Sequence, residues 1–184
     1  MRKATICALV VVLFLWIVAV PAIYAQPPNL IDQHNDEESG CACALTNSLI
    51  FYHPMGQEFI PTRNRLLAVD VLVRDFGGGA TDLNLYIRTD TIDGDIVASE
   101  TFSVTTGFGG WKHIHITPVV SLNPGSKYVI QVELTDMTKN WGWTSDGRCY
   151  VDTYPDGTWI MNGVPQDETC TNDLGFRTYA PPGH

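Results

Sequence analysis

The chain has 184 residues with 11 Lys and Arg against 20 Asp and Glu, which gives a formal net charge of -9 at pH 7. Its length suits one ordinary domain, and its hydrophobic share of 45% is too high for a disordered chain. The acidic balance argues against nucleic acids and anionic membranes as partners, because both attract a basic protein surface.

The N-terminus has the pattern of a secretory signal peptide. A basic start, Met1–Lys3, precedes an uncharged run over residues 4–20, and small residues follow that run. We expect cleavage after Ala25, with cleavage after Ala22 as the near alternative. Retention as an anchor is disfavoured, because about 17 residues is the lower limit of a membrane-spanning helix. The sequence therefore predicts a secreted protein, extracellular or at the cell surface, with no membrane contact after cleavage.

The cysteines fit an exported protein. Cys7 lies within the signal peptide, and the even set that remains predicts two disulfides, formed by Cys41, Cys43, Cys149 and Cys170. A bond between Cys41 and Cys43 would strain the short loop that it closes. We therefore expect the pairings 41–149 with 43–170, or 41–170 with 43–149. A four-thiolate zinc site is disfavoured, because structural zinc sites usually use two C-x(2–4)-C pairs.

The body of the chain has the periodicity of β-strands. Residues 26–56 lack a regular hydrophobic pattern and contain the Cys41-Ala42-Cys43 sequence, which predicts an N-terminal strap. Apolar and polar residues then alternate in short runs, at 69–74, 83–88, 113–116 and 128–134. Turns rich in glycine and proline separate these runs. The sequence predicts an all-β domain, an antiparallel β-sandwich over residues 57–180, with a short tail at 181–184.

Aromatic residues in the second half of the chain are the candidate ligand-binding residues. Sugar rings stack their C–H faces on exposed aromatic rings, while Asp and Asn side chains bond the hydroxyl groups. The candidates are Trp143, Tyr154 and Trp159, which lie in a region rich in Gly and Asp. The alternative is that Trp141 and Trp143 fill the core, as large aromatic residues commonly do.

Two groups of residues have a partial metal-binding pattern. Asp90, Asp93 and Asp95 surround a glycine turn and are a weak calcium candidate, although their spacing does not match an EF-hand. The alternative is a solvated hairpin turn. His113 and His115 share one face of a predicted strand and supply half of a zinc site. The alternative is a solvated strand face, so we expect no cofactor other than the candidate calcium ion.

The order of several sequence segments resembles a known class of extracellular module. The segments are residues 32–33, 56–62, 67–71 and 110–111, the strand entry at 120–130 with its Pro124-Gly125 turn, and the ending at 173–179. On these segments the chain resembles secreted jelly-roll β-sandwich modules similar to carbohydrate-binding modules, found on surface-anchored proteins of bacteria and archaea. The resemblance covers about residues 30–180. It implies a jelly roll of galactose-binding-like or carbohydrate-binding-module-like type, without catalysis.

The sequence therefore predicts a secreted, non-catalytic module that binds a glycan or extracellular polymer. The alternative is a structural or adhesive protein that contacts copies of itself or other surface proteins and has no small ligand. A secreted hydrolase is the least favoured function, because the chain lacks the G-x-S-x-G and H-E-x-x-H motifs.

Overall fold

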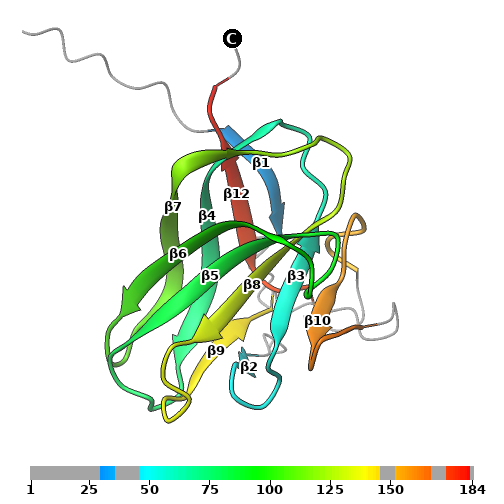
Figure 1. Ribbon diagram of the computed structural model, residues 1–184. Coiled ribbons are helices and arrows are strands. Elements are labelled where there is room, and N and C mark those ends of the chain that lie inside the picture. The colour runs from blue at the N-terminus through cyan, green and yellow to red at the C-terminus, as the bar shows by residue number, and fades with distance from the viewer. Residues whose placement is uncertain (1–29, 36–45, 146–151, 167–172, 183–184) are drawn as a thin grey trace, which may run out of the picture.

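The computed structural model describes residues 30–35, 46–145, 152–166 and 173–182. These residues form twelve β-strands in two antiparallel sheets that face each other (Figure 1). The predicted all-β class and antiparallel two-sheet arrangement are therefore confirmed. No helix occurs among the described residues, and so none of them belongs to a membrane-spanning helix.

Sheet A is organised around one long central strand, β4. Its strands are β1 (Leu30–Asn35), β2 (Thr46–Ser48), β4 (Arg65–Asp75), β7 (Gly109–Ser121), β9 (Trp141–Thr144) and β12 (Phe176–Ala180). One edge of β4 pairs with β7, while the other pairs with β12 over its first half and with β9 over its second half. β1 then pairs with β12, and β2 pairs with β9.

Sheet B is a single row of strands. Its members are β3 (Met55–Phe59), β5 (Thr81–Thr89), β6 (Ile96–Val104), β8 (Tyr128–Leu134), β10 (Trp159–Met161) and β11 (Val164–Pro165). Their order across the sheet is β11-β10-β3-β8-β5-β6.

The core lies between the sheets, where the period-two pattern places it. Val69, Val71 and Val73 of β4 are fully buried, as are the alternating residues Leu83 and Leu85 of β5. Each such side chain contributes roughly 1.5–3 kcal/mol to stability. A second, small apolar cluster of Ile92, Val129 and Ile160 makes β8 buried on both of its faces.

The predicted strap is not irregular in its described part, because it supplies β1 and β2. β1 alternates in burial as an edge strand should, but its buried positions carry the polar residues Gln33 and Asn35. The Asn35 side chain donates from Nδ2 to the carbonyl oxygens of Asp173 (3.0 Å) and Leu174 (3.2 Å). A hydrophobic pattern could not reveal a strand whose inward residues are polar.

Candidate functional site

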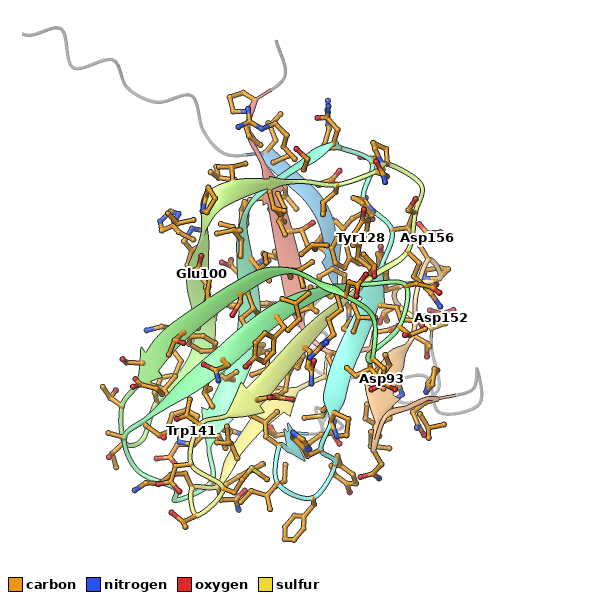
Figure 2. The ribbon with its side chains drawn as sticks, viewed as in Figure 1. Asp93, Glu100, Tyr128, Trp141, Asp152 and Asp156 are labelled. Carbon is orange, nitrogen blue, oxygen red and sulfur yellow. The ribbon has the colours of Figure 1, made fainter. Side chains whose placement is uncertain are left out.

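The three predicted ligand-binding aromatics lie in the core. Trp143 has no exposed surface, and Tyr154 and Trp159 are each 5% exposed. Trp143 points inward on β9 and donates from Nε1 to the carbonyl oxygen of Gly175 (2.8 Å), while Figure 2 labels its buried neighbour Trp141. These rings have no open face for a sugar, so the predicted stacking surface is wrong. The alternative prediction, that Trp141 and Trp143 fill the core, is confirmed.

Tyr154 belongs to a buried hydrogen-bond network. Its hydroxyl donates to Gln33 Oε1 (2.9 Å) and accepts from the amide of Ile60 (3.2 Å), and its ring meets Phe176 edge-on at 5.1 Å. Burial, the largest cause, raises the pKa of the Tyr154 hydroxyl to about 12. The residue therefore ties β1 and β12 to the end of β3 and has a structural role.

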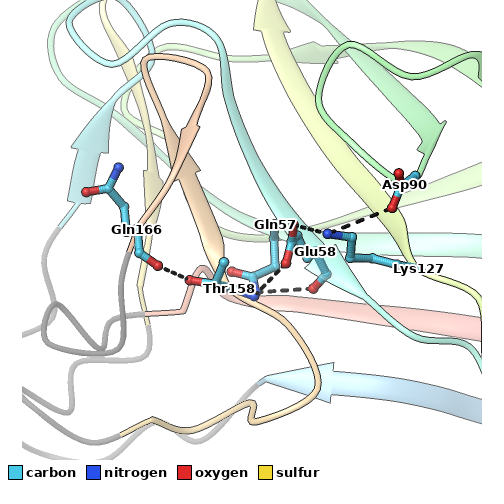
Figure 3. Close-up of polar contacts among 6 residues, drawn as sticks. All are labelled: Gln57, Glu58, Asp90, Lys127, Thr158 and Gln166. Atoms are coloured by element: carbon cyan, nitrogen blue, oxygen red, sulfur yellow. Dashed lines mark hydrogen bonds and ion pairs between the residues drawn. The ribbon is translucent and has the colours of Figure 1, made fainter.

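The next link of the network is Gln57, a fully buried residue of β3. Its Nε2 donates to Asp173 Oδ1 (3.0 Å), and its Oε1 accepts from the amide of Leu174 (2.8 Å). Figure 3 shows Gln57 beside Glu58, whose carboxylate accepts from Lys127 Nζ at 2.9 Å. The two residues hold their neighbours from opposite faces of β3.

The aspartates of the calcium candidate do not form a metal cluster. Asp90, Asp93 and Asp95 are exposed, and Figure 2 labels Asp93 at the surface. Lys127 Nζ lies 3.9 Å from Asp90 Oδ1 (Figure 3). In the described part of the chain, no three His, Cys, Asp or Glu side chains are grouped to hold a metal ion. The segment is a tight β5–β6 hairpin, because a Cβ on Gly94 would lie 1.7 Å from the Thr89 carbonyl oxygen.

The predicted disulfide residues, Cys41, Cys43, Cys149 and Cys170, lie outside the described residues.

Among the described residues, a polar group that the sequence did not predict lies on the surface. We call it the Asp70 cluster, and its members are Asp70 of β4, Trp111 and His113 of β7, and Arg177 and Tyr179 of β12. It lies on the outer face of sheet A, which is the face turned away from sheet B. Asp70 is only 5% exposed, because the other side chains surround it.

Three partners hold the Asp70 carboxylate. His113 Nδ1 lies 2.5 Å from Oδ1, and the Tyr179 hydroxyl donates to Oδ2 at 2.6 Å. Arg177 Nη1 lies 3.6 Å from Oδ2. A buried charge is costly unless it is paired and hydrogen-bonded, and here both oxygens have partners. Burial, followed by the hydrogen bond to Asp70, raises the pKa of the Tyr179 hydroxyl to about 12.

Strand register explains how the cluster assembles. Asp70 is the direct cross-strand neighbour of both Arg177 and His113, and these three residues therefore share one face of the sheet. In the adjacent row Ala68 separates Tyr179 from His115, and its small side chain leaves room for the Tyr179 ring above it.

Ring contacts complete the cluster. His113 meets Tyr179 edge-on at 5.3 Å and His115 at 4.7 Å. The Arg177 guanidinium lies 4.1 Å from the centre of the Trp111 ring, a cation–π contact. The cluster thus offers a rigid group of aromatic rings and hydrogen-bond donors rather than a metal site.

Sequence patterns supply only part of this arrangement. The alternation around Ile114 correctly places His113 and His115 on the outward face, and the same period places Arg177 and Tyr179 on one face of β12. No spacing rule connects Asp70 to partners 43 and 109 residues away along the chain. The contacts arise from the pairing of β4 with β7 and β12, which only the fold defines.

Three of the seven exposed large apolar side chains among the described residues lie on loops: Phe51 between β2 and β3, Phe76 between β4 and β5, and Met137 between β8 and β9. These three loops are at the end of the sandwich that is lowest in Figure 1. Phe51 is 73% exposed. The amide of Phe76 donates to the Asn140 carbonyl oxygen (3.0 Å), which joins two of these loops.

Comparison with known proteins gives no family assignment: no protein-family model matches the chain, and no curated protein matches it.

Proposed function

We propose that the chain is a secreted, non-catalytic β-sandwich module of jelly-roll type that makes protein–protein contacts, using the outer face of sheet A as its contact surface. The Asp70 cluster is the observation that carries this proposal. The few residues that dominate the binding energy of protein interfaces are enriched in Trp, Tyr and Arg, and the cluster contains one of each.

The rigidity of the cluster supports a contact role. Interface side chains that are already fixed lose less conformational entropy on binding, by about 0.5–1.5 kcal/mol for each side chain. Asp70 fixes His113, Tyr179 and Arg177 in the unbound protein, and Arg177 in turn covers one face of Trp111.

Burial of aromatic rings favours protein contacts over glycan binding. Trp143, Tyr154 and Trp159 are in the core, and Trp111 already has Arg177 over its ring. A glycan platform requires ring faces that are open to the sugar. A protein surface can instead use the edges of these rings and the donors beside them.

Contacts among the described residues support the proposed disulfides. Each predicted cysteine belongs to one of three segments, 36–45, 146–151 and 167–172. Residues that flank these segments touch one another: Asn35 bonds Asp173, and Ser145 forms a β-bridge with Leu174. The described residues Asn35, Ser145, Asp173 and Leu174 therefore lie close together, which supports bonds between the three segments. Two such bonds also suit the proposed secretion, because disulfides persist in oxidising compartments.

Site-specific photo-cross-linking would test the contact surface. A benzoylphenylalanine replaces His115, which is exposed beside the Asp70 cluster, or Asp156, which is exposed on a distant turn and serves as the matched control. We expect protein adducts from position 115 alone, formed with purified protein or with the cell-surface fraction, and competed by excess unmodified protein.

A parallel glycan-array screen tests the alternative, glycan binding. Saturable glycan binding that is lost in Trp111→Ala, together with no specific adduct at position 115, would replace the protein-contact proposal with the glycan one.

A further inference from the structure

Charge is divided unequally between the two sheets. The outward positions of the sheet A strands carry three basic and two acidic residues: Arg65, Arg74 and Arg177 against Asp32 and Asp70. The outward positions of the sheet B strands carry one basic and three acidic residues: Arg88 against Glu58, Asp82 and Glu133. The strand histidines, His34, His113 and His115, all belong to sheet A.

The acidic residues of sheet A are occupied by contacts within the molecule. Asp70 is enclosed by its cluster. Asp75 accepts hydrogen bonds from the amides of three glycines, of which Gly107 is at 2.7 Å and is the main cause of the lowered pKa of this carboxyl. Asp32 accepts from the amides of the loop after β3. Arg65 and Arg74, by contrast, are exposed, so the outer face of sheet A presents mainly cationic groups.

The outer face of sheet B presents the opposite charge. Asp82 is exposed on β5, and its carboxylate accepts from the hydroxyl of its neighbour Ser103 (2.6 Å). Glu133 of β8 is the cross-strand neighbour of the outward residue Asn84 and pairs with His53 Nε2 (3.2 Å). The β5–β6 hairpin adds the exposed carboxylates of Asp90, Asp93 and Asp95. Arg88, the basic residue of this sheet, is engaged with Gln131, the Gly94 carbonyl oxygen and the Tyr86 ring.

We infer that the outer face of sheet A docks onto the outer face of sheet B of a second copy of the chain. Complementary charge between two protein faces favours encounter and fixes their orientation. This inference rests on the proposed function, because it names the partner of the same contact surface.

Such a contact is heterologous, since each copy contributes a different face. The free sheet A face of one copy and the free sheet B face of the other remain available after pairing. Contacts of this kind extend into rings or filaments. At physiological ionic strength the Debye length is about 8 Å, so the overall negative charge of the copies is screened more strongly than contacts within the interface.

Two charge-reversal variants test the inference, with all four changes at exposed positions. The sheet A variant is Arg65→Glu with Arg74→Glu, and the sheet B variant is Asp82→Lys with Asp93→Lys. Sedimentation velocity over a concentration series should show self-association of the wild type. Each variant alone should self-associate at least roughly tenfold more weakly, because like charges then face each other.

The decisive sample is an equal mixture of the two variants. Opposite charges then face each other again, so association should return in the mixture although it is lost in each component. Phe51→Ser is the matched control and should associate as the wild type does, because Phe51 lies on the loop between β2 and β3, away from both faces.

A monomeric wild type, or a mixture that stays monomeric, would overturn the inference. Loss of association in Phe51→Ser would also overturn it and would place the contact at the loops. A monomeric wild type that still forms protein adducts from position 115 would leave the proposed function intact and refute only the identity of the partner.

Discussion

Replacing Asp70 with alanine tests the physical account of the cluster most directly. The substitution removes the acceptor for His113 and for the Tyr179 hydroxyl, and it leaves Arg177 without its carboxylate. It leaves the apolar core between the sheets unchanged, because Asp70 points away from sheet B.

The expected loss follows from these contacts. A hydrogen bond to a charged group contributes about 1.5–3 kcal/mol, and two are lost. The Asp70–Arg177 ion pair is longer, at 3.6 Å, and its arginine keeps contact with water, so it adds about 0–1 kcal/mol. Part of this loss is recovered, because the Asp70 carboxylate no longer has to be buried and the released donors can reach water. We therefore expect Asp70→Ala to lower the free energy of unfolding by about 2–4 kcal/mol.

Urea unfolding, followed by intrinsic fluorescence, measures this change. Thr101→Ala is a suitable control, because Thr101 is exposed on the outer face of sheet B and its hydroxyl donates to Asn84 Oδ1 at 2.8 Å. The control should lie within about 0.5–1 kcal/mol of the wild type. In the double variant with Tyr179→Phe the two losses should be less than additive, because both changes remove one shared hydrogen bond. An Asp70→Ala loss no larger than that of the control would refute the idea that the carboxylate organises this face.

Three further predictions concern the core and the β5–β6 turn. The pKa of the Tyr154 hydroxyl is raised to about 12, so the folded state favours its neutral form. About 2–3 kcal/mol of stability that is present below pH 10 should therefore be lost as the pH rises to 12. In urea unfolding, Tyr154→Phe should lose less stability over this pH range than the wild type. Trp143→Ala should cost about 3–5 kcal/mol in the same assay, because the indole is fully buried, and a loss below about 1 kcal/mol would contradict that burial. Calcium and EDTA should give the same thermal midpoint, because the carboxylates of residues 90–95 are not grouped; a calcium-dependent rise of several degrees would show a site there.

Local patterns predicted the strands well where burial and apolar character coincide. Val69, Val71 and Val73 alternate in the sequence and in burial, and the two antiparallel sheets follow from such runs. The same reasoning missed β1, whose inward residues Gln33 and Asn35 are polar. Buried amides that bond distant backbone groups have no signature in hydrophobic periodicity.

Sequence patterns left open whether Tyr154 and Trp159 are exposed or buried. Both lie beside the Pro155-Asp156-Gly157 turn, and this turn packs directly on β3. A Cβ on Gly157 would lie 2.4 Å from the Glu58 carbonyl oxygen, and the Glu58 amide donates to the Thr158 carbonyl oxygen at 2.9 Å. This close approach covers Tyr154 and Trp159, and only the tertiary structure shows it.

The position of β12 has a consequence for how the molecule reaches its final form. This strand is the last along the chain and lies between β1, the first described strand, and β4, with Leu30 opposite Ala180. The β1–β12–β4 order of sheet A therefore forms only after residues 176–180 are in place, and pairing over such long sequence separations is slow.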